Sequence, residues 1–449
     1  MSLAHKSYLL FRREMLVYMV SIVTGAIIAR VLGPTVMGVY LILLMIPAYA
    51  EAFGRLKFDI AAVYFLGKDR HCLGEMTFVL NAVALICSVT IIILYCWKID
   101  FFNAYLFRNA VIQNELLYLI LLYVIFQFVG TNYSYLLIYL EDIRSYNFYL
   151  LIQQIIGPIL AIIFLLVFDL GLLGMVFALV IAYALAVVYA AWKIQRVEKM
   201  IPNFNLQMIK DLFKFSYNLY LSGIVCHLNT YVSSLFVAFY LLPAQVAFFR
   251  MGQDKAKLLH KIPTAIGTIL YPRISKMEDS SEQNANLTAL SYRISLILMS
   301  FSAIIGVLLI RPAVFVLYGK DFLPLSTSFW IFIPGVVLSG ATSVFNQYFI
   351  GIGRPKFSLY ISIIPLIFQI VLGYILIPVY GVVGAAFTTS LTFIGVSLIT
   401  ILVFNKISKV SISQIMLPHK SDFVIISDFI KSQLHSIKPS YNKGEKTCP

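Results

Sequence analysis

The sequence predicts an all-α polytopic membrane protein of about 12 transmembrane helices, in two parallel-repeat six-helix bundles around a central cavity. Three observations lead to this fold class: the composition, a series of apolar stretches of helix length, and an internal repeat. Of the 449 residues, 61% are hydrophobic and 12% are charged, whereas about 25% of the residues in a soluble domain are charged. The mean hydropathy is +0.90. Such a composition is typical of a chain that lies mostly within a bilayer.

The apolar stretches are each close to the ~20 residues that an α-helix needs to cross a bilayer. The first stretch follows Lys6, Arg12 and Arg13 without the small-residue pattern of a cleavage site, so we expect an uncleaved first helix. The expected spans lie at about 14–32, 38–66, 74–96, 115–138, 147–168, 171–192, 213–241, 245–274, 288–310, 326–350, 357–377 and 381–404.

Basic residues are unevenly distributed between the two sides of the predicted membrane. Most lysines and arginines lie in the even-numbered loops and in the C-terminal tail, and the opposite loops hold only Arg30, Lys98, Arg108, Arg311 and Lys320. Because cytoplasmic loops of membrane proteins carry the excess of basic residues, we expect both termini to be cytoplasmic. The same asymmetry accounts for the net charge of +14, so we predict the lipid bilayer, and no nucleic acid, as a partner.

An internal repeat divides the predicted helices into two halves. ARVLGPTVMGVY (29–40) aligns without a gap with AFYLLPAQVAFF (238–249), at an offset of 209 residues. FLLVFDLGLLGMVF (164–177) aligns with YILIPVYGVVGAAF (374–387) at an offset of 210. Parallel repeats of this kind place a substrate site between the halves. We expect an N-terminal bundle at 1–200, a C-terminal bundle at 201–405 and a basic cytoplasmic tail at 406–449.

The predicted span 245–274 is unusual because its first half carries Arg250, Asp254, Lys255, Lys257 and Lys261. All of these except Lys255 fall on one face of a continuous helix, which Gln253 and His260 widen. A charge near the centre of a bilayer costs ~2.5 kcal/mol or more, so we expect this face to border a basic, water-filled cavity. Two alternatives are a helix outside the membrane and charged side chains that reach one interface.

The predicted span 38–66 occupies the equivalent position in the first half and also carries internal charges. Glu51 and Arg55 are four residues apart, so a structural ion pair and a ligand-binding role are both open. We expect Lys57 and Asp59 to lie at the cytoplasmic interface.

Further candidates lie in the first and seventh predicted spans. Asn218, Ser222 and Asn229 share one face of span 213–241, so Asn218 and Asn229 are included as cavity residues. We interpret His227 as a hydrogen-bonded packing residue rather than a proton relay. Arg13, at the start of the first span, either faces the inner mouth of the cavity or anchors the helix on the cytoplasmic side.

No catalytic constellation is found in the sequence. It lacks a nucleotide-binding Gly-rich loop, a metal-ligand cluster and a Ser/His/Asp group, and its five cysteines show no metal-binding spacing. We therefore predict a protein that is not an enzyme and has no cofactor. A basic cavity of low dielectric suits a phosphate or a carboxylate, because charge-assisted hydrogen bonds are strong there.

Three runs resemble the bacterial polysaccharide flippase family, whose members export O-antigen-type repeat units and belong to the multidrug/oligosaccharidyl-lipid/polysaccharide superfamily. They are IIARVLGPTVMGVYLILL (27–44), LYGKDFLPLSTSFWIFIPGVVLSGATSVFNQYFIGIGRPK (317–356) and ILIPVYGVVGAAFTTS (375–390). The resemblance covers most of residues 10–405. It implies a MATE-like, V-shaped pair of six-helix bundles in the bacterial inner membrane. It also implies alternating access that moves a polyprenyl-diphosphate-linked glycan to the outer leaflet, with a polymerase and chain-length machinery as further partners.

The resemblance also implies roles for particular residues. In similar proteins, cations of spans 1, 2, 7 and 8 engage the lipid diphosphate. By position, this role falls to Arg55, Arg250, Lys257 and Lys261, with Arg13 as a further candidate. Asn229 is a departure from the family, because span 7 of such exporters often carries an acidic residue in that region. Coupling to a cation through span 7 is therefore not implied here.

Two other functions fit a similar number of spans. A drug:cation antiporter of the same superfamily needs an acidic cavity to bind cationic drugs, whereas the charged stripe of this chain is mostly basic. A polysaccharide polymerase or ligase needs a sizeable external loop with catalytic residues, and the longest expected external loop runs only from about Lys98 to Asn114.

Overall fold

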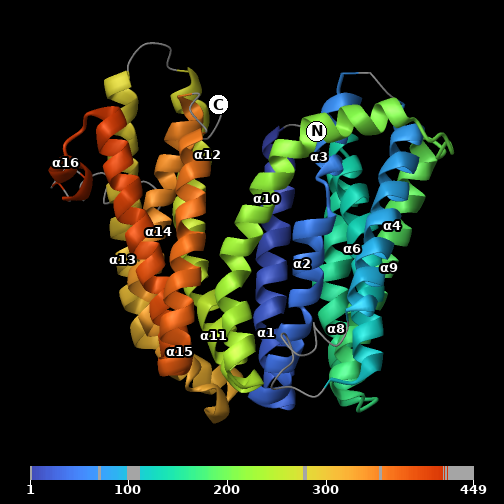
Figure 1. Cartoon of the computed structure of the whole chain (residues 1–449), viewed down its shortest axis with the longest axis horizontal. Helices are drawn as coiled ribbons and strands as arrows, with labels where there is room; N and C mark the ends of the chain where they lie inside the picture. The colour runs from blue at the N-terminus through green and yellow to red at the C-terminus, as the bar shows by residue number, and fades with distance from the viewer. Residues whose placement is uncertain are drawn as a thin grey trace, which may run out of the picture. The chain divides into compact units, whose positions relative to one another are not determined.

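The computed structural model describes residues 3–68, 72–98, 112–276, 281–352 and 356–417, together with His419 and Asp422. Every regular element in these ranges is a helix, as the sequence predicts (Figure 1). An apolar segment in a bilayer must satisfy its backbone polar groups internally, and a helix does this within a single segment.

The helices of the first half of the sequence follow the predicted spans. Single long helices form the third, fourth and sixth spans, whereas the second and fifth spans are divided into shorter pieces. The elements are α1 (Leu3–Leu43), α2 (Met45–Gly54), α3 (Phe58–Leu66), α4 (Leu73–Trp97), α6 (Asn114–Tyr139), α7 (Ile143–Leu151), the π-helical turn η1 (Ile152–Ile156), α8 (Gly157–Leu166) and α9 (Gly171–Val197).

The second half repeats this pattern, with long helices and one predicted span that is interrupted by a 3₁₀ turn. The elements are α10 (Leu206–Tyr240), α11 (Pro243–Lys257), η2 (Leu258–His260), α12 (Lys261–Lys276), α13 (Ser281–Tyr318), η3 (Lys320–Phe322), α14 (Leu325–Gly351), α15 (Lys356–Ser408) and α16 (Ile412–Met416).

Within the described ranges, nine helices are long and apolar enough to cross a membrane. The remaining predicted spans have physical explanations. Span 38–66 begins within α1, and α15 contains the last two spans, because the helices continue through kinks at Gly33 and Gly381. Span 245–274 carries too many charges to be recognised by hydropathy. The predicted fold class of an all-α polytopic membrane protein is confirmed.

By its internal contacts, the chain divides into two compact units. Unit 1 holds Met1–Lys255, Leu309–Phe332 and Ser362–Thr389, and unit 2 holds Ala256–Leu308, Ile333–Ile361 and Ser390–Pro449. Unit 1 therefore contains the first half of the sequence together with parts of the second half. The bundle boundaries predicted at residues 200 and 405 follow the internal repeat, and they remain a prediction.

The core of unit 1 is built on small residues of α9, which packs along α6 and α8 (Figure 1). Ala178, Ala182, Ala186 and Ala190 recur at every fourth position of α9, and all four are fully buried. Such a row of small side chains lets helix backbones approach closely, which drives helix association in membranes.

A second cluster in unit 1 joins the first half of the sequence to segments of the second half. Ala26 and Ala29 of α1 pack with Ala247 and Met251 of α11 and with residues of the segment 314–325. Arg30 donates hydrogen bonds to backbone carbonyl oxygens of Phe315 and Val316. These contacts fix α11 against α1 by its apolar face.

Unit 2 has an aromatic core formed by α13, α14 and α15. The rings of Tyr292 and Phe345 stack at 5.0 Å between centroids, and those of Phe345 and Phe404 stack at 4.3 Å. All three side chains are fully buried, so they contribute strongly to packing within this unit.

The internal repeat has a counterpart in backbone geometry. Gly171 and Gly381, which align at the offset of 210, have φ angles of 53° and 57°. Gly174 and Gly384, which also align, lie close to the side chain four residues earlier: a Cβ atom built on either glycine would be 2.8 Å or 3.0 Å from Leu170 Cβ or Tyr380 Cβ. The two turns therefore share a positive φ and the same close approach, as expected for a structural repeat.

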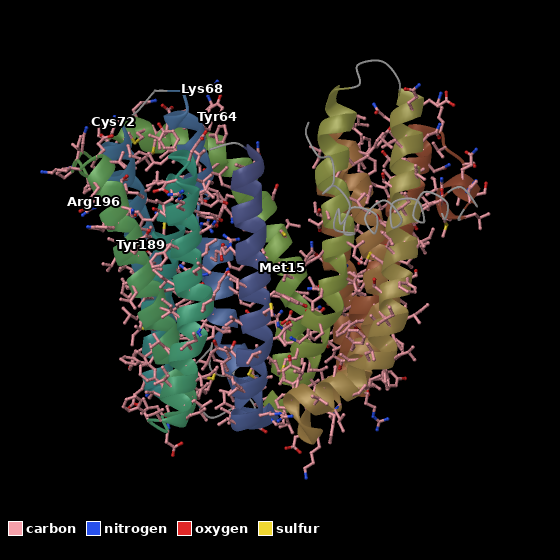
Figure 2. The ribbon with its side chains drawn as sticks, turned by 180° about the vertical axis from the view of Figure 1, so that it is seen from behind. Met15, Tyr64, Lys68, Cys72, Tyr189 and Arg196 are labelled. Atoms are coloured by element: carbon pink, nitrogen blue, oxygen red, sulfur yellow. The ribbon has the colours of Figure 1, made fainter. Side chains whose placement is uncertain are left out.

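Basic residues predicted to be cytoplasmic gather at one end of unit 1. Figure 2 shows Lys68 beside Tyr64 and near Cys72 at this end, with Arg196 on the same part of the unit. The Lys68 ammonium lies 4.7 Å from the Tyr64 ring centre, and the Arg196 guanidinium lies 3.9 Å from that of Trp192. Cation–aromatic pairs of this kind are typical of membrane interfaces, while the side on which this end lies remains a prediction.

The beginning of the predicted tail is held to unit 2 by an ion pair. Arg293 of α13 donates from Nε and Nη2 to the two carboxylate oxygens of Asp422, at 2.7 Å and 3.2 Å, and from Nη1 to the carbonyl of Gln414. Burial of Asp422 disfavours its charged form, but these hydrogen bonds and one from the His419 amide outweigh burial and hold the pKa below its ordinary value.

We expect Gly381→Ala to lower the thermal stability of the purified protein, because a left-handed backbone costs about 1–2 kcal/mol once a Cβ is present. Gly25→Ala is the matched control: Gly25 lies in α1, has open space around it and has a helical φ, so alanine should be neutral or stabilising. Thermal unfolding in detergent would measure both, and equal midpoints for the two variants would contradict the assignment.

We expect the pair of Arg293 and Asp422 to stabilise unit 2 at neutral pH and to lose this effect in acid. Because the pKa of folded Asp422 is depressed, its contribution is complete above the unfolded pKa and disappears as the pH falls through the folded value, below about pH 4. Asp422→Asn should therefore lower the melting temperature at pH 7 and change it little in acid. A loss of equal size at both pH values would contradict this expectation.

Candidate functional site

The second predicted span is broken in its middle, between α2 and α3. Arg55, which follows α2, has an extended backbone, and Lys57, which precedes α3, has a left-handed backbone with a φ of 59°. Non-helical backbone at membrane depth is tolerated where it is buried in protein or lines a polar cavity, and broken helices of transporters often mark their binding sites. The break is therefore the natural place to look for a site.

Four charged side chains surround this break. Arg55 donates from Nη1 to Glu51 Oε1 at 2.7 Å and from Nη2 to Asp59 Oδ2 at 2.5 Å. The Lys57 ammonium lies 4.0 Å from the same Glu51 oxygen. Two cations thus face two carboxylates, so the cluster has no formal net charge while all four groups are ionised.

The two carboxylates differ in their access to solvent. The Asp59 side chain is 1% exposed, and that of Glu51 is 22% exposed. The Asp59 side chain thus lies in the interior of unit 1, while its expected position at the cytoplasmic interface stays a prediction. Lys57 is also largely covered, with 17% of its side chain exposed.

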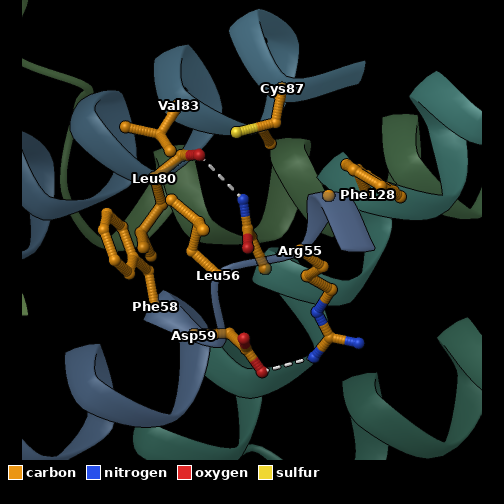
Figure 3. A pocket seen from close by; sticks show the side chains of 11 residues that line it. Arg55, Leu56, Phe58, Asp59, Leu80, Val83, Cys87 and Phe128 are labelled. Carbon is orange, nitrogen blue, oxygen red and sulfur yellow. Dashed lines mark hydrogen bonds and ion pairs between the residues drawn. The ribbon is translucent and has the colours of Figure 1, made fainter. Parts of the chain in front are cut away.

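A small cavity lies beside the ion pair of Arg55 and Asp59 (Figure 3). Its volume is about 20 Å³, which is room for one water molecule. Arg55 Nε and Asp59 Oδ1 are buried and have no hydrogen-bond partner among the described residues. A water molecule can accept from the first and donate to the second, whereas a cation would be repelled by the guanidinium. The cavity thus suits water.

Neighbouring helices complete the cluster around Glu51. Gln127 of α6 donates to Glu51 Oε2 at 3.2 Å. His227 of α10 places Nε2 at 4.0 Å from Glu51 Oε1. The hydroxyl of Tyr220, also on α10, donates to the backbone carbonyl of Phe53 at 2.7 Å, next to the break. Helices α2, α6 and α10 therefore meet at this carboxylate.

A row of stacked groups connects the cluster to α11. The His227 and Tyr231 rings are stacked, with centroids 6.2 Å apart and an angle of 11° between planes. The Arg250 guanidinium lies 5.0 Å from the Tyr231 ring centre and also donates to Ser234 at 3.3 Å. Arg55 and Arg250, predicted as site residues from separate spans, are thus linked through α10 within unit 1.

One face of α10 is polar and exposed. Asn218, Ser222 and Cys226 follow each other at intervals of four residues and are all exposed. Asn229, further along, is partly covered because its amide donates to the carbonyl of Ser362 at 2.6 Å. Polar groups exposed on a membrane helix require water or a polar ligand beside them, so this face favours a hydrated surface.

The basic stripe of the eighth span is not one continuous helix. A 3₁₀ turn at Leu258–His260 separates α11 from α12, and the two units divide between Lys255 and Ala256. Arg250 and Lys255 belong to unit 1, where Lys255 lies 5.5 Å from the Tyr318 ring centre and Asp254 is exposed. Lys257, which is partly covered, and Lys261, which is exposed, belong to unit 2. That these charged residues form one continuous face therefore stays a prediction.

Two residues expected to widen the stripe are packed instead. Gln253 is buried, on the side of α11 that packs within unit 1. His260 lies 3.1 Å from the carbonyl of Val336 and 3.3 Å from the Ser339 hydroxyl, both on α14. His260 is therefore packed against α14 within unit 2, and its place on the stripe stays a prediction.

Arg13 is held by its own helix and by α7. It donates to Asn147 at 3.1 Å, pairs with the adjacent Glu14 and lies 5.7 Å from the Tyr146 ring centre. Its side chain is 9% exposed. These contacts favour a structural role over a direct role in binding.

The described residues contain no group of three or more His, Cys, Asp or Glu side chains that could hold a metal ion. The charged groups around the break can bind ions and exchange protons. Sequence reasoning identified Glu51, Arg55 and Arg250, but it missed His227 and Tyr231 as the link between them. Their spacing of four residues on a polar helix face was the available signal.

Comparison with known proteins supports the predicted fold and the predicted protein family. The chain matches the family described as "Polysaccharide biosynthesis protein" over residues 3–278. It is 20% identical over 209 residues to a probable low-salt glycan biosynthesis flippase, Agl15, of Haloferax volcanii, covering 46% of this chain and 44% of that relative. An uncharacterised membrane protein of Methanocaldococcus jannaschii, MJ1068, is 24% identical over 222 residues, covering 48% and 43%. The chain thus spans less than half the length of these curated relatives.

Solved structures share the fold at low sequence identity. The lipid II flippase MurJ, in an inward closed conformation, aligns with a TM-score of 0.74 at 17% identity, covering 96% of this chain and 98% of its own. An inward-facing multidrug resistance transporter of the MATE family aligns with a TM-score of 0.72 at 14% identity, covering 88% and 96%. The MATE-like architecture expected from the sequence is confirmed.

We expect Cys226 to react with a charged, water-soluble thiol reagent in intact membranes, because it lies on the polar face of α10. A variant that keeps only Cys226 is compared with one that keeps only Cys87, which is half-buried on α4 beside the small cavity. Thiolates form in water and not in apolar surroundings, so only Cys226 should be labelled. Equal labelling of both cysteines, or of neither, would contradict a hydrated face on α10.

Proposed function

Because the chain belongs to the polysaccharide biosynthesis protein family, we propose that it is a flippase for lipid-linked glycans. The substrate is a polyprenyl-diphosphate-linked oligosaccharide of the O-antigen repeat-unit type. The protein moves it by alternating access from the cytoplasmic to the outer leaflet of the bacterial inner membrane, with both termini in the cytoplasm. A polysaccharide polymerase and the chain-length machinery receive the product on the far side.

One observation carries this proposal: an exposed polar face on α10 runs beside a row of cationic and aromatic groups inside an otherwise apolar protein. Arg250, Tyr231 and His227 form this row, and it ends at Arg55 and Lys57. A face of this kind supports the passage of a charged headgroup, since the low dielectric strengthens each ionic contact.

The anionic diphosphate is the part of the substrate that most needs protein contacts. We propose that Arg250 and Arg55 bind it from unit 1, together with Lys255 and, from the sequence pattern, Lys257 and Lys261. Asn218 and Asn229 offer amide groups to the sugars, and Glu51 and Asp254 balance the cations. With the cell interior negative, outward movement of the anion is favoured by ~2.3 kcal/mol per charge per 100 mV.

The charge cluster argues against export of cationic drugs. A cationic substrate needs an available carboxylate, but Glu51 and Asp59 are both paired with the Arg55 guanidinium. No metal site that could support hydrolysis or transfer occurs among the described residues. Binding and transport of an anion therefore fit the site better than drug export or polymerisation.

We expect Arg250→Ala or Lys257→Ala to reduce flipping of the lipid-linked glycan by at least tenfold, because each removes a cation that the diphosphate needs. Flipping is measured as access of a membrane-impermeant glycan probe to the lipid-linked sugar in vesicles. Lys320→Ala is the control, because Lys320 is an exposed cation in η3, outside the predicted site. Normal flipping by both site variants, at normal protein levels, would overturn these roles.

A further inference from the structure

Glu51 occupies a special position in the charge cluster because one of its oxygens faces three basic groups. Arg55 Nη1, Lys57 Nζ and His227 Nε2 lie 2.7, 4.0 and 4.0 Å from Glu51 Oε1. The other oxygen accepts from Gln127. Arg55 and Lys57 are thus occupied by this carboxylate, and they can bind an external anion only if its charge is removed or displaced.

The second carboxylate cannot play the same part. Asp59 is 1% exposed and holds Arg55 Nη2 from within unit 1, beside the small cavity of Figure 3. Its side chain has almost no contact with water, and its partner is the Arg55 guanidinium. Asp59 therefore anchors the guanidinium, while Glu51, with 22% of its side chain exposed, is the carboxylate that a proton can reach.

His227 is a titratable neighbour of this carboxylate. An imidazole changes its charge between about pH 5 and 8, and this one lies beside Glu51 on the helix that carries the exposed polar face. The groups that face the pair come from every element packed around it: Arg55, Lys57 and Asp59 from the break and α3, Tyr123 from α6, Tyr183 from α9, and Cys226 and Tyr231 from α10.

We propose that Glu51 and His227 together form a proton-binding site that controls whether Arg55 and Lys57 are available to an anionic headgroup. This inference rests on the proposed function and names how the same site is regulated. A proton taken from water onto the pair removes one unit of negative charge or adds one unit of positive charge. The cluster then changes from neutral to net positive and can accept the diphosphate.

The backbone of the break fits such a switch. Lys57 is held in a left-handed conformation, which is strained for a residue with a side chain. Its side chain lies against Gly223 of α10, where a Cβ atom would be 3.1 Å from Lys57 Cε. Lys57 therefore contacts α10 close to His227. A change in the ionic partner of Lys57 acts directly at this contact between the break and α10.

Thermodynamic linkage turns this arrangement into a measurable property. If proton binding favours anion binding, anion binding must favour proton uptake by the same factor. For one linked proton, the affinity for an anion falls by up to tenfold per pH unit as the pH rises through the apparent pKa of the pair. Because the pair acts as a unit, this pKa belongs to both groups.

The experiment measures binding of a short-chain prenyl-diphospho-sugar to the purified full-length protein between about pH 5 and 8. The diphosphate of this probe is a diester and keeps its charge over that range. We expect the wild-type Kd to rise with pH. Glu51→Gln, which keeps the size and the hydrogen-bonding ability of the side chain, should bind tightly at every pH. His227→Asn should shift the pH profile or shorten its range.

Asp142→Asn is the matched control, since it removes one carboxylate far from the cluster in sequence while asparagine still caps α7. It should show the wild-type profile. Binding that is equally strong at all pH values in the wild type would overturn the proton switch and leave the flippase proposal intact. Absence of binding by folded wild-type protein at every pH would instead overturn the proposed function. A Glu51→Gln profile that matches the wild type would assign the linkage to other groups and also overturn the switch.

Discussion

The structure depends on one constraint: a cation inside an apolar protein must have a partner, because charge in a low-dielectric medium is costly. Arg55 meets this constraint by pairing with Glu51 on one side and with Asp59 on the other. The chain leaves the helix at residues 55–57, and the Arg55 side chain there joins the last turn of α2 to the first turn of α3 through these two ion pairs.

The same constraint explains how two further cations of unit 1 are arranged. Arg250 lies over Tyr231, and Lys255 lies near Tyr318. An aromatic face stabilises a cation without cancelling its charge. Cations held in this way remain available to an anion, whereas Arg55 is neutralised by two carboxylates. In the proposed site, Arg250 and Lys255 can thus bind an anion directly, whereas Arg55 must first be released from its carboxylate partners.

Much of the fold could be predicted from the sequence because span length, loop charge and the repeat are local properties. The turn at Gly381 was visible from its alignment with Gly171, and both have the same left-handed backbone. The break at Lys57 could not be predicted, because a lysine in the sequence gives no sign of a left-handed φ. Tertiary contacts impose this conformation. The 3₁₀ turn at Leu258–His260 was not predicted either, although Pro263, which cannot donate to the carbonyl of Leu259, follows it closely.

The candidate site shows why pairs of residues are harder to predict than single ones. Glu51 and Arg55 could be predicted as a pair because they are four residues apart in one predicted span. Glu51 and His227 come from opposite halves of the repeat and meet only when α10 packs on the broken helix. That meeting matters for the proposed switch: an ion pair within one helix can serve stability alone, but the strength of a titratable contact between two helices depends on how α10 packs on the broken helix. A proton bound there is therefore sensitive to conformation, and conformation is sensitive to the proton.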